Sequence, residues 1–506
     1  MDILQPDLKS FKKKYDLNKP QLLFTALSAD LYTPVSTLLK FEKEKYIFLF
    51  ESVEKGNQKG RYSAIGIKPD LIWECKNSEI TIKELLNKTF VKKSETKISP
   101  IESLKKLFKN NKFKIPNHLP PMSSGLFGYL GYEMISHFEN VKFNNKDVLQ
   151  LPDSVFIRPS IMMIFDNVKD NLFIVKTVWP KKNLKPNLAF SQAKEQINSI
   201  LNKLKGSISK KLYKTKSQLV KYKYDVKKGV YSNLNYAQFK NIVEKAKRYI
   251  YSGEVFQVVL SRYFKKKINC SALSIYRALR YLNPSPYLFF IKFKNFSVIG
   301  SSPEILVKLK NDIVTIRPIA GTRKRGKNSL EDIKLENDLL TDKKEISEHL
   351  MLLDLGRNDT SKVCKPGTVK VTKQMYVEYF SHVMHIISNI NGEIDPKFDN
   401  VDAFFSGFPA GTVSGAPKIR ALEIIEELEK TKRNIYSGGI GYLSADGNLD
   451  SCIALRTAVI KNDTIYVQSG AGIVADSNPK SEFLETENKA LAILEATIYS
   501  AHFEGN

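Results

Sequence analysis

The pattern of apolar and polar residues predicts strands and short helices between positions 20 and 180. Residues 46–53 (YIFLFESV) form a nearly continuous apolar run, which is typical of a buried strand, and residues 154–166 and 171–179 predict an antiparallel pair. A helix is expected over about 188–205. Residues 205–233 are polar and show no helical periodicity, so we interpret this stretch as a linker.

Helical and strand patterns alternate in the rest of the chain. A helix of about 15 residues begins near Asn235 and is expected to stop at Gly253, before a strand at 255–263. Further strands are predicted at 296–309, 313–322, 438–444, 451–461 and 464–468, and further helices at 341–355 (ending at Gly356), 417–429 and 482–498. The alternation predicts an α/β chain of the α+β type, with an N-terminal unit at 1–205, a linker at 206–233 and a C-terminal unit at 234–506.

Composition is that of an ordinary globular protein. The 506 residues are enough for two large domains, and 42% are hydrophobic while 26% are charged. No apolar run approaches the ~18–20 residues of a membrane span, and the N-terminus lacks the apolar segment of a secretory signal, so we expect no membrane partner and a cytoplasmic location. The cysteines stand far apart in sequence, which fits neither a zinc site nor a disulfide framework.

The chain is strongly basic, with 79 Lys+Arg against 53 Asp+Glu and a net charge of +26. Such a charge is common in nucleic-acid-binding proteins. The lysines are nevertheless scattered along the whole chain, and neither an arginine-rich tail nor a nucleic-acid-binding module can be recognised. We therefore interpret the charge as the surface of an enzyme that uses no nucleic acid, and keep a nucleic-acid-binding protein as the alternative of a different class.

Two pairs of glutamates, each spaced i,i+3 on a predicted helix, are Glu345 with Glu348 and Glu482 with Glu485. This spacing places both carboxylates of a pair on one helix face. Two such helices brought together would suit Mg²⁺, which takes one or two protein carboxylates besides water and substrate oxygens. The alternatives are local: Asp342 with Glu345 resembles a capping box, and Glu485 with Lys489 forms a surface i,i+4 pair.

Glycine-rich turns follow several predicted strands, at 318–326, 410–418, 436–442 and 469–477. Glycine allows backbone N–H groups to approach a carboxylate closely, although most such turns are only turns. None of them matches a phosphate-binding or dinucleotide-binding fingerprint, so a nucleotide site is not expected.

Four single side chains could carry chemistry, among them Arg357 in the segment DLGRND. Arg456 lies in an apolar predicted strand and therefore needs an anionic partner, either an internal carboxylate or a ligand. His385 is set among apolar residues, where a histidine is usually a core residue and less often a catalyst. Glu304 follows Pro303 at the end of a buried run, where burial would raise its pKa and make it a candidate general acid.

Together these segments closely resemble the chorismate-utilising enzymes, and among them the anthranilate synthase component I family. The motifs occur in the family's order: FQVVLSR, GSSPEIL, RPIAGTRKRG, EHLMLLDLGRND, SHVMHI, FPAGTVSGAPK, YSGGIGY, ALRTAV and GAGIVADS…ETENK. The N-terminal half adds FESVE…GRYS and GYLGYE, so the resemblance covers nearly the whole chain. It implies two antiparallel-rich sheets packed face to face with helices outside, and an N-terminal unit that senses tryptophan.

The resemblance also implies an activity. The chain would be the large subunit of a lyase that converts chorismate and ammonia to anthranilate and pyruvate, the first committed step of tryptophan biosynthesis. Glu348 and Glu485 match the family's Mg²⁺ ligands, with Glu345 and Glu482 in support.

The remaining site residues follow from the same motifs. The residues that match substrate contacts are Gly321, Thr322, Tyr436, Arg456, Gly470, Ala471 and Gly472. Glu304 matches the acid that protonates the departing C4 hydroxyl, and His385 matches the residue linked to pyruvate elimination. Thr322, besides contacting substrate, is expected among the catalytic residues.

Two positions distinguish this chain from its relatives. Aminodeoxychorismate synthases commonly carry a lysine nucleophile where this chain has Ala320, which cannot form a covalent adduct. Water-using relatives carry a lysine base where this chain has Gln257, which cannot take a proton. Both favour anthranilate synthase, and aminodeoxychorismate synthase component I is the sibling alternative.

The resemblance further implies an inhibitor site and a partner. The motifs LFES and NPSPYL supply the residues that match a tryptophan site: Glu51, Ser52, Pro286, Tyr287 and Leu288. No cysteine lies in a G-x-C-x-G motif, so use of glutamine requires a separate glutamine amidotransferase subunit, and a heterotetramer with two copies of each subunit is expected.

Overall fold

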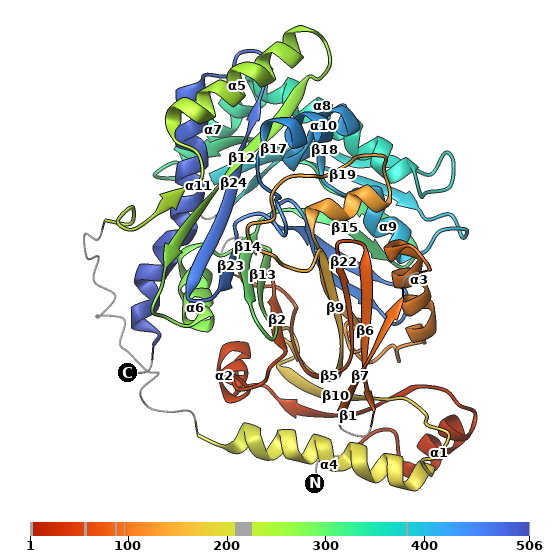
Figure 1. The fold of residues 1–506 in the computed structure, drawn as a ribbon. Coiled ribbons are helices and arrows are strands. Elements are labelled where there is room, and N and C mark those ends of the chain that lie inside the picture. Colours follow the sequence, from red (N-terminus) through yellow and green to blue (C-terminus); the bar gives the residue numbers. More distant parts are fainter. Residues whose placement is uncertain are drawn as a thin grey trace.

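The computed structural model describes residues 4–54, 58–86, 89–95, 97–207, 225–380 and 383–504, which form a body of antiparallel strands with helices around it (Figure 1). The helices are α1 (Leu8–Asp16), α2 (Pro34–Lys40), α3 (Pro100–Asn111), α4 (Pro186–Lys205), α5 (Tyr236–Tyr251), α6 (Ala272–Leu282), α7 (Ser329–Thr341), α8 (Lys343–Ser361), α9 (Asn400–Ser406), α10 (Lys418–Leu428) and α11 (Pro479–Tyr499), with short 3₁₀ helices η1 (Tyr132–His137), η4 (Gly411–Val413) and η5 (Ser500–His502).

The strands form two runs that share strand β9 (Ser154–Asp166). One run continues through β5 (Tyr62–Lys76), β2 (Ile47–Glu51), β13 (Tyr287–Lys292), β14 (Ser297–Ser302), β23 (Thr457–Lys461), β24 (Thr464–Ile473) and β12 (Gln257–Lys267). The other continues through β8 (Gly125–Leu130), β21 (Gly439–Ser444), β22 (Leu449–Ile453), β15 (Ile305–Lys310), β16 (Ile313–Ile316) and β19 (Val383–Glu393), which also pairs with β17 (Ile319–Lys324) and β18 (Lys370–Tyr379).

Shorter strands extend these runs: β1 (Gln21–Ser28) and β10 (Asn171–Val178) beside β9, β6 (Glu79–Leu86) and β7 (Thr89–Glu95) beside β5, and β11 (Tyr231–Ser232) and β20 (Gly415–Ala416) beside β12. A separate pair is formed by β3 (Val53–Glu54) and β4 (Gln58–Lys59).

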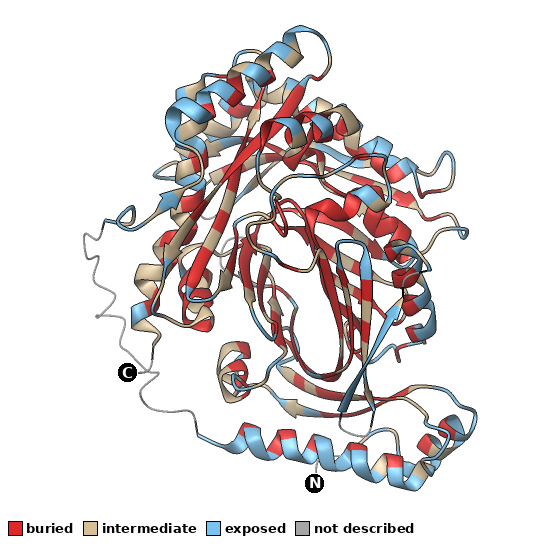
Figure 2. Cartoon of the chain, in the orientation of Figure 1, coloured by how far each residue is buried: buried red, intermediate tan, exposed pale blue. Residues whose placement is uncertain are grey.

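The two runs pack face to face through an apolar cluster to which both contribute. Phe48 of β2 stacks on Phe127 of β8 with ring centroids 4.6 Å apart. Buried residues accordingly concentrate in the strands (Figure 2). The expected fold, α/β with antiparallel-rich sheets and helices outside, is confirmed.

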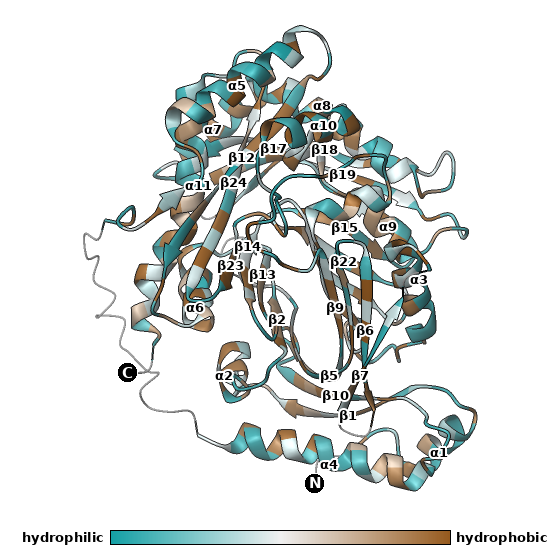
Figure 3. Ribbon diagram, in the orientation of Figure 1, coloured by the Kyte–Doolittle hydropathy of each residue, from teal (hydrophilic) through white to brown (hydrophobic). Residues whose placement is uncertain are grey.

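Helices cover the outer faces because their apolar residues recur at helical spacing. On α4, Ala193, Ile197, Ile200 and Leu204 are buried while the opposite face is polar, and the helix alternates in hydropathy along its length (Figure 3). Helix α5 begins at a capping box in which Asn235 and Gln238 satisfy each other's backbone N–H groups. In the described residues, no helix combines the length and the apolar character that crossing a bilayer requires.

Several predicted elements are interrupted or extended. The predicted strand 296–309 is two strands, β14 and β15, because Pro303 between them cannot donate a ladder hydrogen bond. The predicted strand 313–322 is also divided, into β16 and β17, at Pro318, which lacks an N–H group for the same reason. The helix predicted to stop at Gly356 continues to Ser361. A Cβ on Gly356 would lie 2.6 Å from Ile390 Cδ1, so this glycine allows α8 to approach β19 and does not end the helix.

Strands of the two predicted units pair with each other. The N-terminal β2 pairs with β13, and β8 pairs with β21. The division at 205 and 234 stays a prediction, since the middle of the expected linker, residues 208–224, lies outside the described residues.

Candidate active site

The predicted site residues gather where the two runs end away from β9. Strands β12 and β24 contribute the end of one run, β17 and β19 that of the other, and helices α8 and α11 pack beside them (Figure 1). Segments far apart in sequence thus meet in one region.

The first glutamate pair lies on α8. Glu348 Oε1 accepts a hydrogen bond of 3.3 Å from Gln257 Nε2, and Gln257 in turn lies against Gly472, where an added Cβ would come within 2.4 Å of Nε2. Glu345 lies beside Gly321, where an added Cβ would be 3.3 Å from Glu345 Oε2. The backbone of Gly321 has a φ of +78°, a conformation that favours glycine. Asp342 caps α8 through the N–H groups of Lys344 and Glu345, so the expected local role of this aspartate is also present.

The second glutamate pair lies on α11. Glu485 forms an ion pair of 2.6 Å with Lys489, as expected for an i,i+4 pair, and Lys489 Nζ also donates to the Gly470 carbonyl at 3.0 Å. Glu348 and Glu485 are therefore connected, through Gln257 and Lys489, to glycines two positions apart on β24.

The donor set suits Mg²⁺. Burial, followed by the nearby Glu348 carboxylate, raises the pKa of Glu345, and burial with a contribution from Glu485 raises the pKa of Glu482. A divalent cation would relieve this crowding of like charges. Among the described residues, no three histidine, cysteine, aspartate or glutamate side chains are already clustered as a metal cage. Mg²⁺ needs only one or two protein carboxylates.

Glu304 is a buried carboxyl with one side-chain donor. It is 6% exposed, and the Thr412 hydroxyl donates to its Oε1 at 3.1 Å. Burial raises the pKa of Glu304 to about 8. The side chain is therefore protonated at neutral pH, as a general acid must be before it acts.

His385 on β19 is positioned by two residues of the neighbouring strand β17, Gly321 and Thr322. Its Nδ1 lies 3.1 Å from the Gly321 carbonyl and 3.0 Å from Thr322 Oγ1. A carbonyl only accepts, so the proton belongs on Nδ1 and the lone pair on Nε2. Burial, with a smaller effect from the Arg456 charge, lowers the pKa of His385 to about 4, so the ring is a neutral base at physiological pH.

Arg456 is not inside a strand, and this expectation was wrong. It lies between β22 and β23 with a φ of +46°, because the predicted strand 451–461 is broken there. Its side chain is open to solvent, although the surrounding protein is close enough to lower its pKa by desolvation. Among the described residues, no carboxylate forms an ion pair with it, which leaves its charge free for an anionic ligand.

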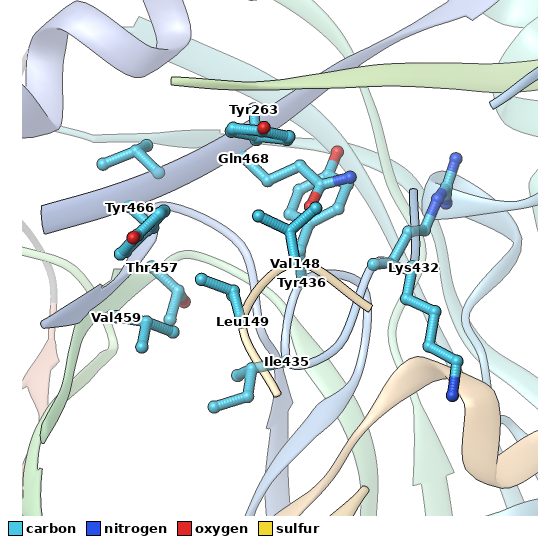
Figure 4. A pocket seen from close by; sticks show the side chains of 12 residues that line it. Val148, Leu149, Tyr263, Lys432, Ile435, Tyr436, Thr457, Val459, Tyr466 and Gln468 are labelled. Atoms are coloured by element: carbon cyan, nitrogen blue, oxygen red, sulfur yellow. The ribbon is translucent and has the colours of Figure 1, made fainter. Parts of the chain in front are cut away.

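Tyr436 completes this side of the site. Its hydroxyl would lie 2.8 Å from a Cβ on Gly470, and burial raises its pKa to about 12, so it is a neutral hydroxyl. Figure 4 shows the side chains that line a cavity beside Tyr436, among them Tyr263, Gln468 and Leu149. None of the four glutamates lines this cavity.

The residues predicted to bind an effector line a second cavity. Its lining includes Glu51, Ser52, Pro286, Tyr287 and Leu288, together with aromatic residues and Asp450, and the space between them, with the adjoining solvent, is about 550 Å³. Arg280 already holds the Glu51 carboxylate with bonds of 2.8 and 3.1 Å.

The sequence patterns missed two residues of these sites. Asp450 accepts from the Tyr287 hydroxyl at 3.0 Å, and Thr412 donates to Glu304. Thr412 had a weak signal in sequence, since it stands in a glycine-rich turn, whereas Asp450 had none. The pairing of Lys489 with Glu485 was expected from its spacing, but the hydrogen bond from Lys489 to the Gly470 carbonyl on another element was not.

Comparisons with known proteins show which family the chain belongs to. A family profile described as "chorismate binding enzyme" matches residues 48–495. Anthranilate synthase component 1 of Cereibacter sphaeroides is 46% identical over 492 residues, covering 96% of each chain, and that of Aquifex aeolicus is 43% identical over 478 residues, covering 94% of each.

Solved structures agree as well. Anthranilate synthase component I from Streptococcus pneumoniae superposes with a TM-score of 0.72 at 35% identity, over 86% of this chain and 92% of that one. The menaquinone-specific isochorismate synthase of Escherichia coli, at 18% identity, has a TM-score of 0.69 over 97% and 98% of the two chains and shares the fold. The chain therefore belongs to the chorismate binding enzymes, with anthranilate synthase component 1 proteins as its full-length relatives.

Proposed function

We propose that this enzyme converts chorismate and ammonia to anthranilate, pyruvate and water. The observation that carries the proposal is the near-complete alignment with anthranilate synthase component 1 proteins at 42–46% identity. Ala320 and Gln257, which cannot act as nucleophile or base, support ammonia as the attacking group.

The site supplies the charges that chorismate, a dianion, requires. Arg456 and Tyr436 would bind the enolpyruvyl carboxylate, and the backbone of Gly470, Ala471 and Gly472 would face the ring carboxylate. Glu348 and Glu485, supported by Glu345 and Glu482, would hold Mg²⁺, which when bound neutralises carboxylate charge and orients the substrate.

Two residues would move protons. Ammonia attacks C2 as the C4 hydroxyl departs, and Glu304 gives its proton to that hydroxyl, which leaves as water. The Nε2 lone pair of His385, positioned by Gly321 and Thr322, is suited to take the C2 proton. As the C2 proton leaves, the C3–O bond breaks and the ring becomes aromatic. The departing enolpyruvate takes up the proton that the new ammonium group loses and is released as pyruvate.

The test is a product assay. The purified chain, incubated with chorismate, Mg²⁺ and ammonium salt at mildly alkaline pH, should release anthranilate, detected by its fluorescence, and an equal amount of pyruvate. A mass spectrum with 4-amino-4-deoxychorismate and no anthranilate would contradict the proposal and favour aminodeoxychorismate synthase. Salt-sensitive RNA binding without turnover would favour the nucleic-acid alternative.

We further propose that the cavity beside Tyr287 binds tryptophan as a feedback inhibitor. Its aromatic and apolar walls suit an indole, and Ser52 offers a hydroxyl to the amino-acid group. Both carboxylates of the cavity already have a cationic partner, Glu51 in Arg280 and Asp450 in Lys308 at 3.2 Å, so the ammonium group of the ligand would share one of them with that partner.

Replacing Ser52 with alanine is expected to raise the tryptophan inhibition constant about 2–10-fold, which corresponds to one neutral hydrogen bond. Uninhibited turnover should be unchanged, because Ser52 lies outside the active site. The measurement is a tryptophan titration of anthranilate formation, with Ser199→Ala on the exposed face of α4 as control. Equal inhibition of both variants would refute the role of Ser52.

A glutamine amidotransferase is the proposed partner. The relatives are named component 1, and the chain has no cysteine in a nucleophile motif of its own. We propose a heterotetramer with two copies of each subunit, in which the partner supplies ammonia from glutamine.

A further inference from the structure

Arg262 on β12 is a buried arginine that forms no hydrogen bond or ion pair with a carboxylate of the described residues. It is 2% exposed, and burial lowers its pKa to about 10. At longer range the charge of Glu487 raises the pKa of Arg262, but by less than burial lowers it. Isolated buried charge is strongly unfavourable unless polar acceptors surround it. Its contacts therefore indicate what compensates the charge.

The guanidinium is bound by neutral acceptors and aromatic rings. Nε donates to Thr486 Oγ1 at 2.8 Å and Nη2 to the Phe483 carbonyl at 2.9 Å, both on α11. The Phe483 ring lies 3.7 Å from the guanidinium carbon and the Phe264 ring 4.6 Å, which are cation–π distances. Nη1 makes longer contacts to Ser232 and Leu234, before α5.

A neighbouring residue binds the same turn of α11. Ser469 stands opposite Arg262 in the β12–β24 pairing, and its hydroxyl donates to the Thr486 carbonyl at 2.6 Å. Ser469 directly precedes Gly470, whose carbonyl accepts from Lys489. The two strands thus attach α11 through Phe483 and Thr486, and these strands and the helix lie side by side in Figure 1.

The attached residues are the direct neighbours of the carboxylates. Phe483 follows Glu482 and Thr486 follows Glu485, so the attached face is about 100° around the helix from the carboxylate face. Any rotation of α11 about its axis would swing both carboxylates relative to β24. The planar guanidinium holds its donors in a fixed fork and so opposes that rotation, whereas a lysine ammonium, a point charge on a flexible stem, would not fix the directions of both α11 acceptors.

We propose that Arg262 is a positioning residue that sets the rotation of α11 and thereby directs Glu482 and Glu485 toward the metal. The proposal rests on the proposed role of Glu485 as a Mg²⁺ ligand. Arg262 itself touches neither substrate nor metal, and it acts through the backbone and side chain of the helix.

The test is Mg²⁺ affinity in the absence of chorismate. Arg262→Lys should raise the Mg²⁺ Kd about 10–100-fold, as expected for residues that orient metal ligands, measured by calorimetric titration and by the increase in Tm with Mg²⁺ concentration. Ser469→Ala, which removes a single hydrogen bond, should raise it in the same direction and serves as a milder variant if Arg262→Lys does not fold.

Arg158→Lys is the matched control. Like Arg262, Arg158 lies over an aromatic ring, Trp179, at 4.3 Å, but its charge is paired with Asp70 and it lies in the N-terminal half. This variant should lose stability and keep the wild-type Mg²⁺ Kd.

Two results would overturn the proposal. If Glu485→Gln loses Mg²⁺ binding while Arg262→Lys and Ser469→Ala retain it, Arg262 only stabilises the fold. If wild type and Glu485→Gln bind Mg²⁺ equally, the metal assignment itself is wrong and the role of Arg262 is refuted with it.

Discussion

Replacing Glu304 with glutamine is expected to lower kcat about 10²–10⁴-fold, the usual contribution of a positioned general acid. Glutamine keeps the shape and the hydrogen bond from Thr412 but has no acidic proton for the departing C4 hydroxyl. The variant should still bind chorismate, so KM should change little. Glu393→Gln, which disrupts a surface ion pair with Lys365, is the control and should retain wild-type turnover.

The same residue predicts a pH dependence. Because burial raises the pKa of Glu304 to about 8, the active acid form is present below that pH and is lost as pH rises through it. The alkaline limb of the kcat/KM profile for chorismate, which reports the free enzyme, should therefore fall near pH 8 in wild type and be absent from the residual activity of Glu304→Gln. Thr412→Val removes a bond that favours the carboxylate, so the limb should move to higher pH. An unchanged profile in both variants would exclude Glu304 as the acid.

Glu485→Gln is expected to reduce kcat/KM about 10²–10³-fold, as for other preorganised electrostatic groups. The substitution removes one negative charge from the set that would hold Mg²⁺ and leaves Lys489 without its ion-pair partner. Kinetics at increasing Mg²⁺ should show a raised requirement for the metal and partial recovery at high concentration.

The control for this prediction lies on the same helix. Glu495 lies ten residues beyond Glu485, near the C-terminal end of α11, and Glu495→Gln should retain wild-type kcat/KM and Mg²⁺ dependence. Full activity of Glu485→Gln at low Mg²⁺ would contradict the metal assignment.

Much of the fold could be predicted from sequence because its signals are local. The strand 154–166 and the helix ending at Lys205 agree with the observed β9 and α4, since alternation and helical spacing depend on nearby residues only. Breaks within strands were missed at Pro303, at Pro318 and before Thr457. Gly356 was misread, because whether a glycine ends a helix or allows close packing depends on a neighbour, here Ile390, on another strand.

The sequence by itself determined the family, the ordered motifs, the i,i+3 spacing of the glutamates and the identity of the acid, base and arginine candidates. Only the tertiary structure decided the protonation states: burial raises the pKa of Glu304, and burial lowers that of His385, whose Nδ1 proton is donated to a carbonyl. Only the tertiary structure also decided that Arg456 has no ion-pair partner among the described residues and that Arg262 is hydrogen-bonded to the helix that carries Glu482 and Glu485. The physical reason is that motifs and spacing are properties of neighbouring positions, whereas protonation, exposure and orientation depend on desolvation and hydrogen bonds from segments that meet only after folding.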